Sequence, residues 1–324
     1  MPAPPTPEFW ARRGPVSSLL QPLAWGYALG TSARRCWTQP WRAPVPVICI
    51  GNLVAGGAGK TPVALSLARR LKARGRPVHI LSRGYGGSLV GPVLVDAARH
   101  GAAAVGDEPL LLAEAAPCWV ARDRVAGAKA AIAAGAKLLL LDDGLQNPHL
   151  AKTLSLLVVD GGYGFGNGRV LPAGPLRERL APGLARAEAV VVMGEDMAGI
   201  APLIAGKTVL RARLAPTNAE EVAGRKLVAF AGIGRPEKFF ASLAAAGGLI
   251  VARHGFADHH RYRESELARL QAEAAETGAR LVTTAKDRVR LPASWRARVG
   301  VLEVAVAWED EAALDALLDR AGDG

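Results

Sequence analysis

Residues 56–61 have the composition of a loop that binds phosphate. Three glycines in this segment are followed directly by Lys60 and Thr61. Backbone N–H groups can surround an anion only where no Cβ atom blocks them, and a helix that begins there adds the positive end of its dipole. In such a loop the lysine reaches the β- and γ-phosphates of a nucleotide, and the threonine hydroxyl binds Mg²⁺. The predicted nucleotide-binding residues are Gly56, Gly57, Ala58, Gly59, Lys60, Thr61 and Pro62.

The segments on either side of this loop favour the same assignment. Residues 45–50 are short, apolar and rich in β-branched side chains, as expected for a buried strand. Apolar residues recur at helical spacing over residues 63–71. The usual loop pattern has glycine where this chain has Val54, so an ordinary turn that contains Gly-Lys-Thr is the alternative. The strand before and the helix after the loop favour phosphate binding.

Acidic residues follow two further predicted elements. Residues 136–141 (AKLLLL) form an apolar strand that ends at Asp142 and Asp143. This is the arrangement of a Walker B element, whose carboxylate holds Mg²⁺ directly or through water. Two adjacent carboxylates are costly to bury together, which favours metal binding over a structural role. Asp107 and Glu108 precede an apolar helix, where they could point at the nucleotide or could simply cap that helix and complement its dipole.

Two more segments carry candidate side chains. The glycine-rich residues 160–178 include Arg169 and Arg177, which a mobile loop could close over phosphates; an ordinary surface loop is the alternative. In FADHHRY, Asp258 stands beside His259, a natural proton-accepting or orienting pair, although a helix N-cap at Asp258 is the simpler reading. No cysteine lies near these histidines, so the sequence does not indicate a zinc site.

The order of the elements predicts an α/β fold. Predicted strands alternate with predicted helices, which is typical of parallel sheets flanked by helices. We predict a P-loop NTPase-like core over residues 45–220, a linker within residues 216–225, and a second, smaller α/β domain over residues 221–324. Residues 308–324 are predicted to form one terminal helix.

Residues 1–44 differ from the rest of the chain. They hold four of the seven tryptophans and five arginines, against the single acid Glu8. Apolar residues from Val16 to Tyr27 fall on one helical face, but the stretch is shorter than the roughly 20 apolar residues of a spanning helix, and no signal-peptide cleavage pattern follows it. We predict an amphipathic helix at a membrane surface, with Trp at headgroup depth and Arg facing anionic lipid. The alternative is a helix that packs on the protein core, and one helix can do both.

The composition sets wider limits. The chain has 324 residues, half of them hydrophobic, which is enough for two packed domains. Its net charge of +11 indicates an anionic partner: nucleotide, nucleic acid or an acidic membrane surface. The three cysteines form no CxxC pair, so a reducing cytoplasm fits better than a disulfide framework.

Taken together, the motifs closely resemble those of the tetraacyldisaccharide 4'-kinase family of lipid A biosynthesis. The matching segments run in order from about Trp10 to Leu291, and the glycine-rich block is specific to the family. The family's own loop shares the departure at Val54, whereas Asn147 stands where many relatives have His, which leaves the role of that side chain open. The segments are GNLVAGGAGKTP, LSRGYGG, VGDEP, DDGLQ, GFGNGRVLPAGPLRE, FAGIGRPEKFF, FADHHRY and TAKDRVRL.

The resemblance implies a specific reaction. A member of this family would be a peripheral or monotopic enzyme at the cytoplasmic face of the inner membrane. It would transfer the γ-phosphate of ATP to the 4'-hydroxyl of a tetraacylated glucosamine disaccharide 1-phosphate and so form lipid IVA. The expected partners are this acylated lipid and an anionic membrane surface, with neither nucleic acid nor a stable protein partner.

The resemblance also implies roles for individual residues. By motif, Lys60 holds ATP, and Asp107 acts with His259 or its neighbour His260 as the base on the sugar hydroxyl. Arg177 contacts phosphate. The implied Mg²⁺ ligands are Thr61, Asp142, Asp143 and Glu108.

Two other classes of protein compete with this interpretation. A P-loop ATPase or GTPase switch without a lipid acceptor would share the phosphate loop and the acidic pair Asp142 and Asp143. The segment TAKD does not have the arrangement associated with guanine recognition, which weakens a GTPase. A nucleic-acid binder would account for the charge, but the arginines are dispersed and lack interleaved aromatic residues outside the N-terminal segment.

Overall fold

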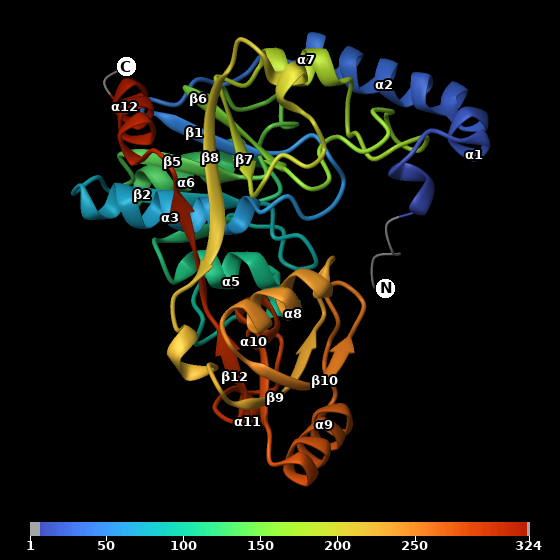
Figure 1. The fold of residues 1–324 in the computed structure, drawn as a ribbon. Coiled ribbons are helices and arrows are strands. Elements are labelled where there is room, and N and C mark those ends of the chain that lie inside the picture. Colours follow the sequence, from blue (N-terminus) through green and yellow to red (C-terminus); the bar gives the residue numbers. More distant parts are fainter. Residues whose placement is uncertain (1–6, 323–324) are drawn as a thin grey trace.

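The computed structural model describes residues 7–322, and these residues form two sheets of unequal size. Figure 1 shows the larger sheet with its helices in the upper part of the molecule and the smaller sheet below it. Residues 1–6 of the predicted N-terminal segment and residues 323–324 of the predicted tail lie outside the described residues.

The large sheet has nine strands in the order β13-β8-β7-β6-β1-β5-β2-β4-β3. Its interior pairs are all parallel, and only the outermost pairs, β13 with β8 and β3 with β4, are antiparallel. The parallel arrangement and the fold class agree with the prediction. The strands are β1 (Val47–Gly51), β2 (Val78–Ser82), β3 (Val93–Leu94), β4 (Cys118–Val120), β5 (Leu138–Asp142), β6 (Leu154–Asp160), β7 (Ala189–Met193), β8 (Thr208–Pro216) and β13 (Val304–Trp308).

Helices cover both faces of this sheet because its central strands are apolar on both sides and fully buried. One face packs against α3 (Lys60–Ala73), α5 (Asp107–Ala113) and α12 (Glu311–Gly322). The other packs against α2 (Gln21–Cys36), α6 (Arg124–Ala133) and α7 (Leu180–Ala185). A short helix, α4 (Ala102–Val105), precedes α5.

The small sheet is entirely parallel, with the order β10-β9-β11-β12. Two apolar clusters lie on its two faces: one includes Phe230 and Leu267 of α9, and the other includes Phe240 of α8. The elements are β9 (Lys226–Ala231), α8 (Pro236–Ala245), β10 (Leu249–Gly255), α9 (Glu264–Thr277), β11 (Arg280–Thr284), α10 (Ala285–Arg288), α11 (Ala293–Arg296) and β12 (Gly300–Leu302).

The predicted terminal helix is present as α12, although it begins at Glu311 and not at Trp308. A strand that was not predicted, β13, precedes it and pairs antiparallel with β8. α12 packs on the large sheet beside α3, where Arg70 forms ion pairs with Glu311 and Asp315. The residues from Val304 onward therefore belong to the large sheet, and the small sheet is inserted in the chain between β8 and β13, which are neighbours in the large sheet. Where the chain passes from one sheet to the other, the Thr217 N–H donates to the Glu303 carbonyl at 3.0 Å.

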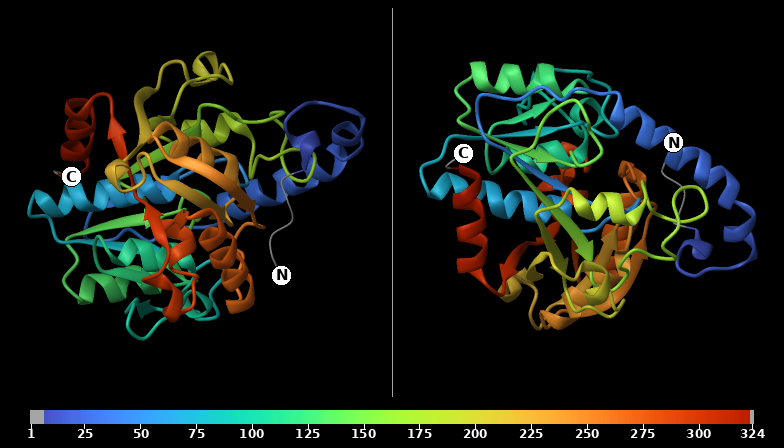
Figure 2. Two further views of the ribbon diagram at one scale, coloured as in Figure 1. Left: turned by 60° about the horizontal axis from the view of Figure 1, so that its bottom comes forward. Right: turned by 90° about the horizontal axis from the view of Figure 1, so that it is seen from above.

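Two consecutive helices form the N-terminal part, α1 (Pro15–Leu19) and α2, and a short 3-10 helix, η1 (Glu8–Trp10), comes before them. In the right-hand view of Figure 2, α1 and α2 lie on the opposite side of the molecule from α12. α2 buries Ala24 and Ala28 against the core, so it does dock there, while large apolar side chains remain exposed. Within residues 7–322 no helix has both the length and the apolar character needed to span a bilayer.

Candidate active site

The predicted phosphate loop connects β1 to α3, as the sequence indicated. Gly59 takes φ +87° immediately before α3 begins at Lys60, a backbone conformation that favours glycine. The loop is held from the side by the glycine-rich segment: the Ala55 N–H donates to the Pro175 carbonyl and the Arg177 N–H to the Leu53 carbonyl, each at 2.7 Å. The loop that leads into α3 is therefore braced by a second stretch of backbone.

Asn52, which the sequence analysis did not single out, organises this loop. Its fully buried side chain donates from Nδ2 to the Val54 carbonyl at 2.7 Å, and its Oδ1 accepts a bond from Lys60 Nζ at 3.1 Å. One amide thus fixes both the start of the loop and the lysine that follows it. An asparagine after a strand is common in turns, so only its position one residue beyond β1 could have marked it.

The acidic pair lies at the carboxyl end of β5. Asp142 is the last residue of the strand and is buried, and Asp143 follows it with φ +54°. Asp143 accepts two bonds from Arg177 Nη1, at 2.9 and 2.8 Å, and lies 3.7 Å from Lys60 Nζ. Burial raises the pKa of Asp143, but the charges of Lys60 and Arg177 outweigh it and lower the pKa overall. Three of the predicted residues therefore meet at one point.

The pKa of Asp142 is shifted in the opposite direction from that of Asp143. Burial, together with the charges of Glu108 and Asp143, raises its pKa to about 7. Its Oδ1 atom is buried and has no hydrogen-bond partner among the described residues. A buried carboxylate oxygen without a partner is costly, and a cation would remove that cost.

Asp107 is the first residue of α5, and Gly106 before it has φ +91°, so the N-cap alternative for Asp107 is wrong. Asp107 is 4 % exposed; its Oδ1 accepts the Glu108 N–H and its Oδ2 is 2.9 Å from His259 Nδ1. Burial raises the pKa of Asp107, but the bond to His259 and the charges of Lys286 and Arg290 outweigh burial and lower the pKa to about 2. Asp107 is therefore a carboxylate that holds an imidazole.

His259 comes from the small sheet, in the turn after β10, and has φ +59°. Its Nδ1 atom is bound to Asp107, and its Nε2 atom is 3.5 Å from Lys286 Nζ. Lys286 is also 3.5 Å from Glu108, so a second pair of charged groups joins the two sheets. No helix begins at Asp258, because α9 begins only at Glu264.

The neighbouring His260 points elsewhere. Its Nε2 atom is 3.1 Å from Glu266, and its ring stacks on Phe256. Of the two histidines between which the sequence could not choose, His259 is the partner of Asp107.

The predicted residues of both sheets line one cleft of about 2030 Å³. The phosphate loop and α2 border it from the large sheet, and α8 and the His259 turn border it from the small sheet. Predicted residues on its wall include Gly56, Gly57, Ala58, Gly59, Lys60, Thr61, Pro62, Glu108, Asp142, Asp143, Arg177 and His259. A cleft of this size accommodates a nucleotide together with a second substrate.

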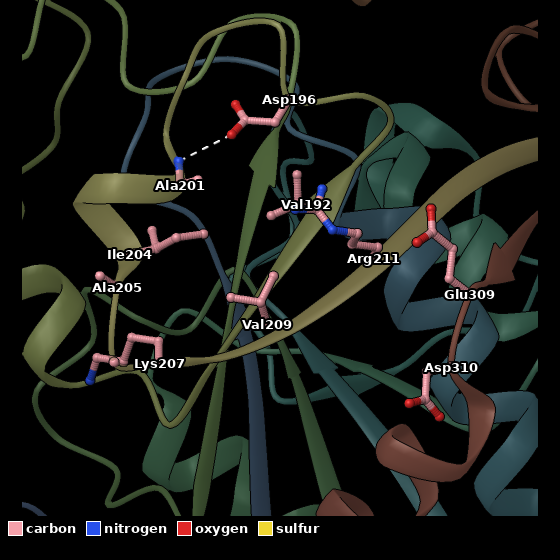
Figure 3. Close-up of a pocket in the computed structure, with 11 residues that line it drawn as sticks. Val192, Asp196, Ala201, Ile204, Ala205, Lys207, Val209, Arg211, Glu309 and Asp310 are labelled. Atoms are coloured by element: carbon pink, nitrogen blue, oxygen red, sulfur yellow. Dashed lines mark hydrogen bonds between the residues drawn. The ribbon is translucent and has the colours of Figure 1, made fainter.

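A smaller hollow of about 280 Å³ lies beside β7 and β8 (Figure 3). None of the predicted site residues lines it. The Asp196 carboxylate there is occupied, because it accepts the Ala201 N–H at 3.0 Å and the Ile200 N–H at 2.9 Å at the start of η2 (Ala201–Ile204). The chemistry therefore belongs to the large cleft.

The glycine-rich segment is packed and not a loop at the surface. Asn167, Leu176 and Glu178 are all buried. Arg177 reaches the acidic pair as predicted, but Arg169 donates to the hydroxyls of Ser17 and Ser18 in α1, at 3.1 Å each, because the segment lies against the N-terminal helices. The expectation that Arg169 closes over phosphates is therefore not met in this structure.

Asn147 has a local role. Its Oδ1 atom accepts the N–H groups of His149 and Leu150, at 3.0 and 3.3 Å, which closes a turn after the acidic pair. Gln146, beside it, donates to the Asn52 carbonyl at 2.9 Å and so joins this turn to the phosphate loop.

Comparison with known proteins adds independent information. A sequence model of the family described as Tetraacyldisaccharide-1-P 4'-kinase matches residues 16–322. The tetraacyldisaccharide 4'-kinase of Rhodospirillum centenum is 58 % identical over 320 residues, which cover 96 % of this chain and 95 % of that protein. The tetraacyldisaccharide 4'-kinase of Gluconacetobacter diazotrophicus is 57 % identical over 317 residues and 97 % of each chain.

A solved structure is similar over nearly the whole fold. It is the crystal structure of the "apo" form of LpxK from Aquifex aeolicus in complex with ATP at 2.2 Å resolution. The TM-score is 0.78 at 28 % sequence identity, and the match covers 95 % of this chain and 100 % of that one. The sequence motifs, the fold and these relatives agree: the chain belongs to the tetraacyldisaccharide-1-P 4'-kinase family.

Proposed function

We propose that this protein transfers the γ-phosphate of ATP to the 4'-hydroxyl of a tetraacylated disaccharide 1-phosphate, giving ADP and the bisphosphorylated lipid IVA. Family membership supports the reaction class. The observation that carries the proposal is that His259, which is held by the buried Asp107, lines the same cleft as the phosphate loop. A nucleotide switch needs the loop but has no use for a base that faces it.

Lys60 and the backbone of residues 56–59 bind the triphosphate. Asn52 holds Lys60 Nζ on one side, and Asp143 lies on the other. Arg177 adds a second cation next to Asp143 and contacts the transferred phosphate. Phosphoryl transfer requires positioning and charge neutralisation more than covalent chemistry, and these groups supply both.

The acidic residues fit a divalent cation. Mg²⁺ is usually bound by one or two carboxylates together with the substrate's phosphates, and Asp142 Oδ1 is a buried oxygen without a partner among the described residues. The residues that would hold the ion are Thr61, Asp142, Asp143 and Glu108. Among residues 7–322 no three acidic, histidine or cysteine side chains lie close enough to bind a metal by themselves, so the phosphates of the nucleotide would have to complete the site. When bound, the ion neutralises charge on the phosphates.

His259 is the proton acceptor. Asp107 is almost fully buried and both its oxygens are occupied, whereas the His259 side chain is 25 % exposed and borders the cleft. With Nδ1–H donating to Asp107, the Nε2 atom, which lies 3.5 Å from Lys286 Nζ, accepts the proton of the 4'-hydroxyl. As the sugar oxygen forms its bond to phosphorus, the bond to the ADP oxygen breaks, and the proton passes to His259.

The N-terminal helices attach the protein to the cytoplasmic face of the inner membrane without spanning it. α1 and α2 expose large apolar side chains, among them Leu19 at 81 %, Trp25 at 67 % and Leu29 at 72 %. Basic residues flank them, and each near an anionic surface is worth about 1 kcal/mol. The attachment is therefore reversible, and it places the cleft beside α2 within reach of an acylated substrate. Neither nucleic acid nor a stable protein partner is required.

The reaction is tested with purified full-length protein, γ-labelled ATP and tetraacyldisaccharide 1-phosphate in mixed micelles. We expect label in the lipid, and none with the Lys60→Ala variant. Label released only as inorganic phosphate, at the same rate with and without lipid, would instead identify a nucleotide switch, and equal use of GTP would point the same way.

Membrane attachment is tested separately. Full-length protein should float with vesicles that contain phosphatidylglycerol and less with vesicles of phosphatidylcholine alone. The double variant Leu19→Ser, Leu29→Ser should reduce flotation on both. Flotation equal to wild type would show that these side chains do not insert.

A further inference from the structure

Glu178 is a buried carboxylate that joins the N-terminal helices to the core. Its side chain is 4 % exposed. Arg186 Nη2 donates to both carboxylate oxygens at 2.7 Å, and Arg35 Nη2, from the last turn of α2, is 2.8 Å from Oε2. A buried charge needs partners on every side, so Arg35 completes this site and is not an incidental surface contact.

The same carboxylate fixes Gln146. Gln146 Nε2 donates to Glu178 Oε1 at 3.3 Å and to the Asn52 carbonyl at 2.9 Å. With its nitrogen committed to these two acceptors, the amide presents Oε1 to Arg177 Nη1 at 3.5 Å. A chain of contacts therefore runs from Arg35 through Glu178 and Gln146 to the groups that hold Lys60 and Asp143.

The C-terminal end of α2 is held by Arg35 and, five residues beyond the helix, by Trp41, whose N–H donates to the His149 carbonyl at 2.8 Å. The residues that α2 buries against the core, Ala24 and Ala28, are small and bury little apolar area. At the other end, Ser17 in α1 donates to the Ala173 carbonyl at 2.6 Å and accepts from Asn167 Nδ2 at 2.9 Å. Arg35 thus ties the C-terminal end of the helix to Glu178, the residue that follows Arg177 in the chain.

We infer that Arg35 is a positioning residue for phosphoryl transfer: through Glu178 and Gln146 it sets the placement of Arg177 beside the acidic pair. The position of α2, whose other face is exposed and apolar, is thereby coupled to the geometry of the nucleotide site. This inference rests on the proposed kinase reaction.

Arg34 provides a matched control. It precedes Arg35 in the same turn and is exposed, and no ion pair joins it to Glu178. R34Q and R35Q each remove one positive charge from the helix that faces the lipid, so any effect of charge on lipid binding is common to both. We expect both variants to change the KM for the lipid substrate by a similar factor, whereas kcat of R35Q falls about tenfold or more below that of R34Q.

Two further measurements make the comparison decisive. R35K keeps the charge and should recover part of the lost kcat. Thermal melting of each variant identifies any that fail to fold; if R35Q does, kcat of R35K against R34K decides the question. Equal kcat in the paired variants, with the wild type active, overturns the inference, whereas a wild type that never labels the lipid overturns the proposed function.

Discussion

Asp107 and His259 lie 152 positions apart in the chain, on different sheets, and are joined at 2.9 Å between Oδ2 and Nδ1. His259 adopts a left-handed backbone conformation there, which costs about 1–2 kcal/mol for a residue with a Cβ atom. Its N–H is bound by the Gly232 carbonyl and by Asp258 Oδ1, so contacts within the small sheet hold the turn in place. The strained turn presents one of two adjacent histidines to the large sheet.

The two histidines should differ sharply when each is replaced. His259→Gln removes the proton acceptor and should lower kcat about 100-fold or more, because a general base typically contributes at least this factor to the rate. His260→Gln changes a side chain bound to Glu266 and should cost less than about threefold, which makes it the matched control. Steady-state kinetics with saturating ATP measures both. Similar losses in the two variants would show that His259 acts only through the structure of the turn.

Asn52 should matter for nucleotide affinity although it need not contact the nucleotide. Asn52→Ala frees Lys60 Nζ and the Val54 carbonyl at once, and we expect ATP to bind about tenfold more weakly, or about 1.4 kcal/mol. Asn52→Asp keeps an acceptor for Lys60 but loses the donor to Val54, so it should fall between wild type and alanine. Titration with a fluorescent ATP analogue measures the three affinities, and an unchanged affinity for the alanine variant would contradict this role.

The thiols should react in two classes. Cys36 is exposed at the end of α2, whereas Cys49 and Cys118 are buried in the large sheet. Burial raises the pKa of Cys49 to about 12 and also raises that of Cys118, so neither forms the reactive thiolate at neutral pH. A thiol reagent should modify one cysteine in the native protein and three after denaturation, and none in native Cys36→Ser. Rapid modification of a second thiol would show that the sheet opens.

His79 should make stability depend on pH. Its Nδ1 atom accepts a bond from Trp119 Nε1 at 3.2 Å, and burial lowers its pKa from the ordinary 6.5. Below that value the unfolded chain binds a proton that the folded chain binds less readily, so stability falls as the pH drops through 6.5. The urea midpoint should decrease between pH 7.5 and 5.5 by more in the wild type than in His79→Gln. Parallel decreases in both proteins would remove His79 as the cause.

Much of the site could be predicted because its residues follow local patterns. The phosphate loop and the acidic pair each come at the end of an apolar strand, and parallel strands bring such ends to one edge of a sheet. Asp107 and Glu108 came from the family resemblance, since their local context fits a helix start equally well. The strand positions of the core follow from continuous apolar runs such as residues 138–141.

The parts of the fold and the site that the sequence did not predict depend on contacts between residues far apart in the chain. Nothing near Arg35 in the sequence indicates Glu178, and their pairing arises only when α2 packs beside the glycine-rich segment. The choice of His259 over His260 depends on contacts with residues far from the motif or beyond it, because His259 binds Asp107 and His260 binds Glu266. Residues 304–308 (VAVAW) are too short to distinguish a strand from the start of a helix, and they became a strand because the edge of β8 was free to pair.

The antiparallel pair of β8 and β13 has one more consequence. The polypeptide enters the small sheet along one of these strands and leaves it along the other, so both covalent links pass through a single ribbon only two strands wide. Such a ribbon bends and twists far more easily than a layered core. Besides the ribbon, ionic contacts join the two sheets across the cleft, namely His259 with Asp107, Lys286 with Glu108, and Arg235 and Lys238 with Asp160, and Val289 packs on the core of the large sheet. Any change in the width of the cleft would therefore have to be taken up by β8 and β13 and by the contacts that join the two sheets.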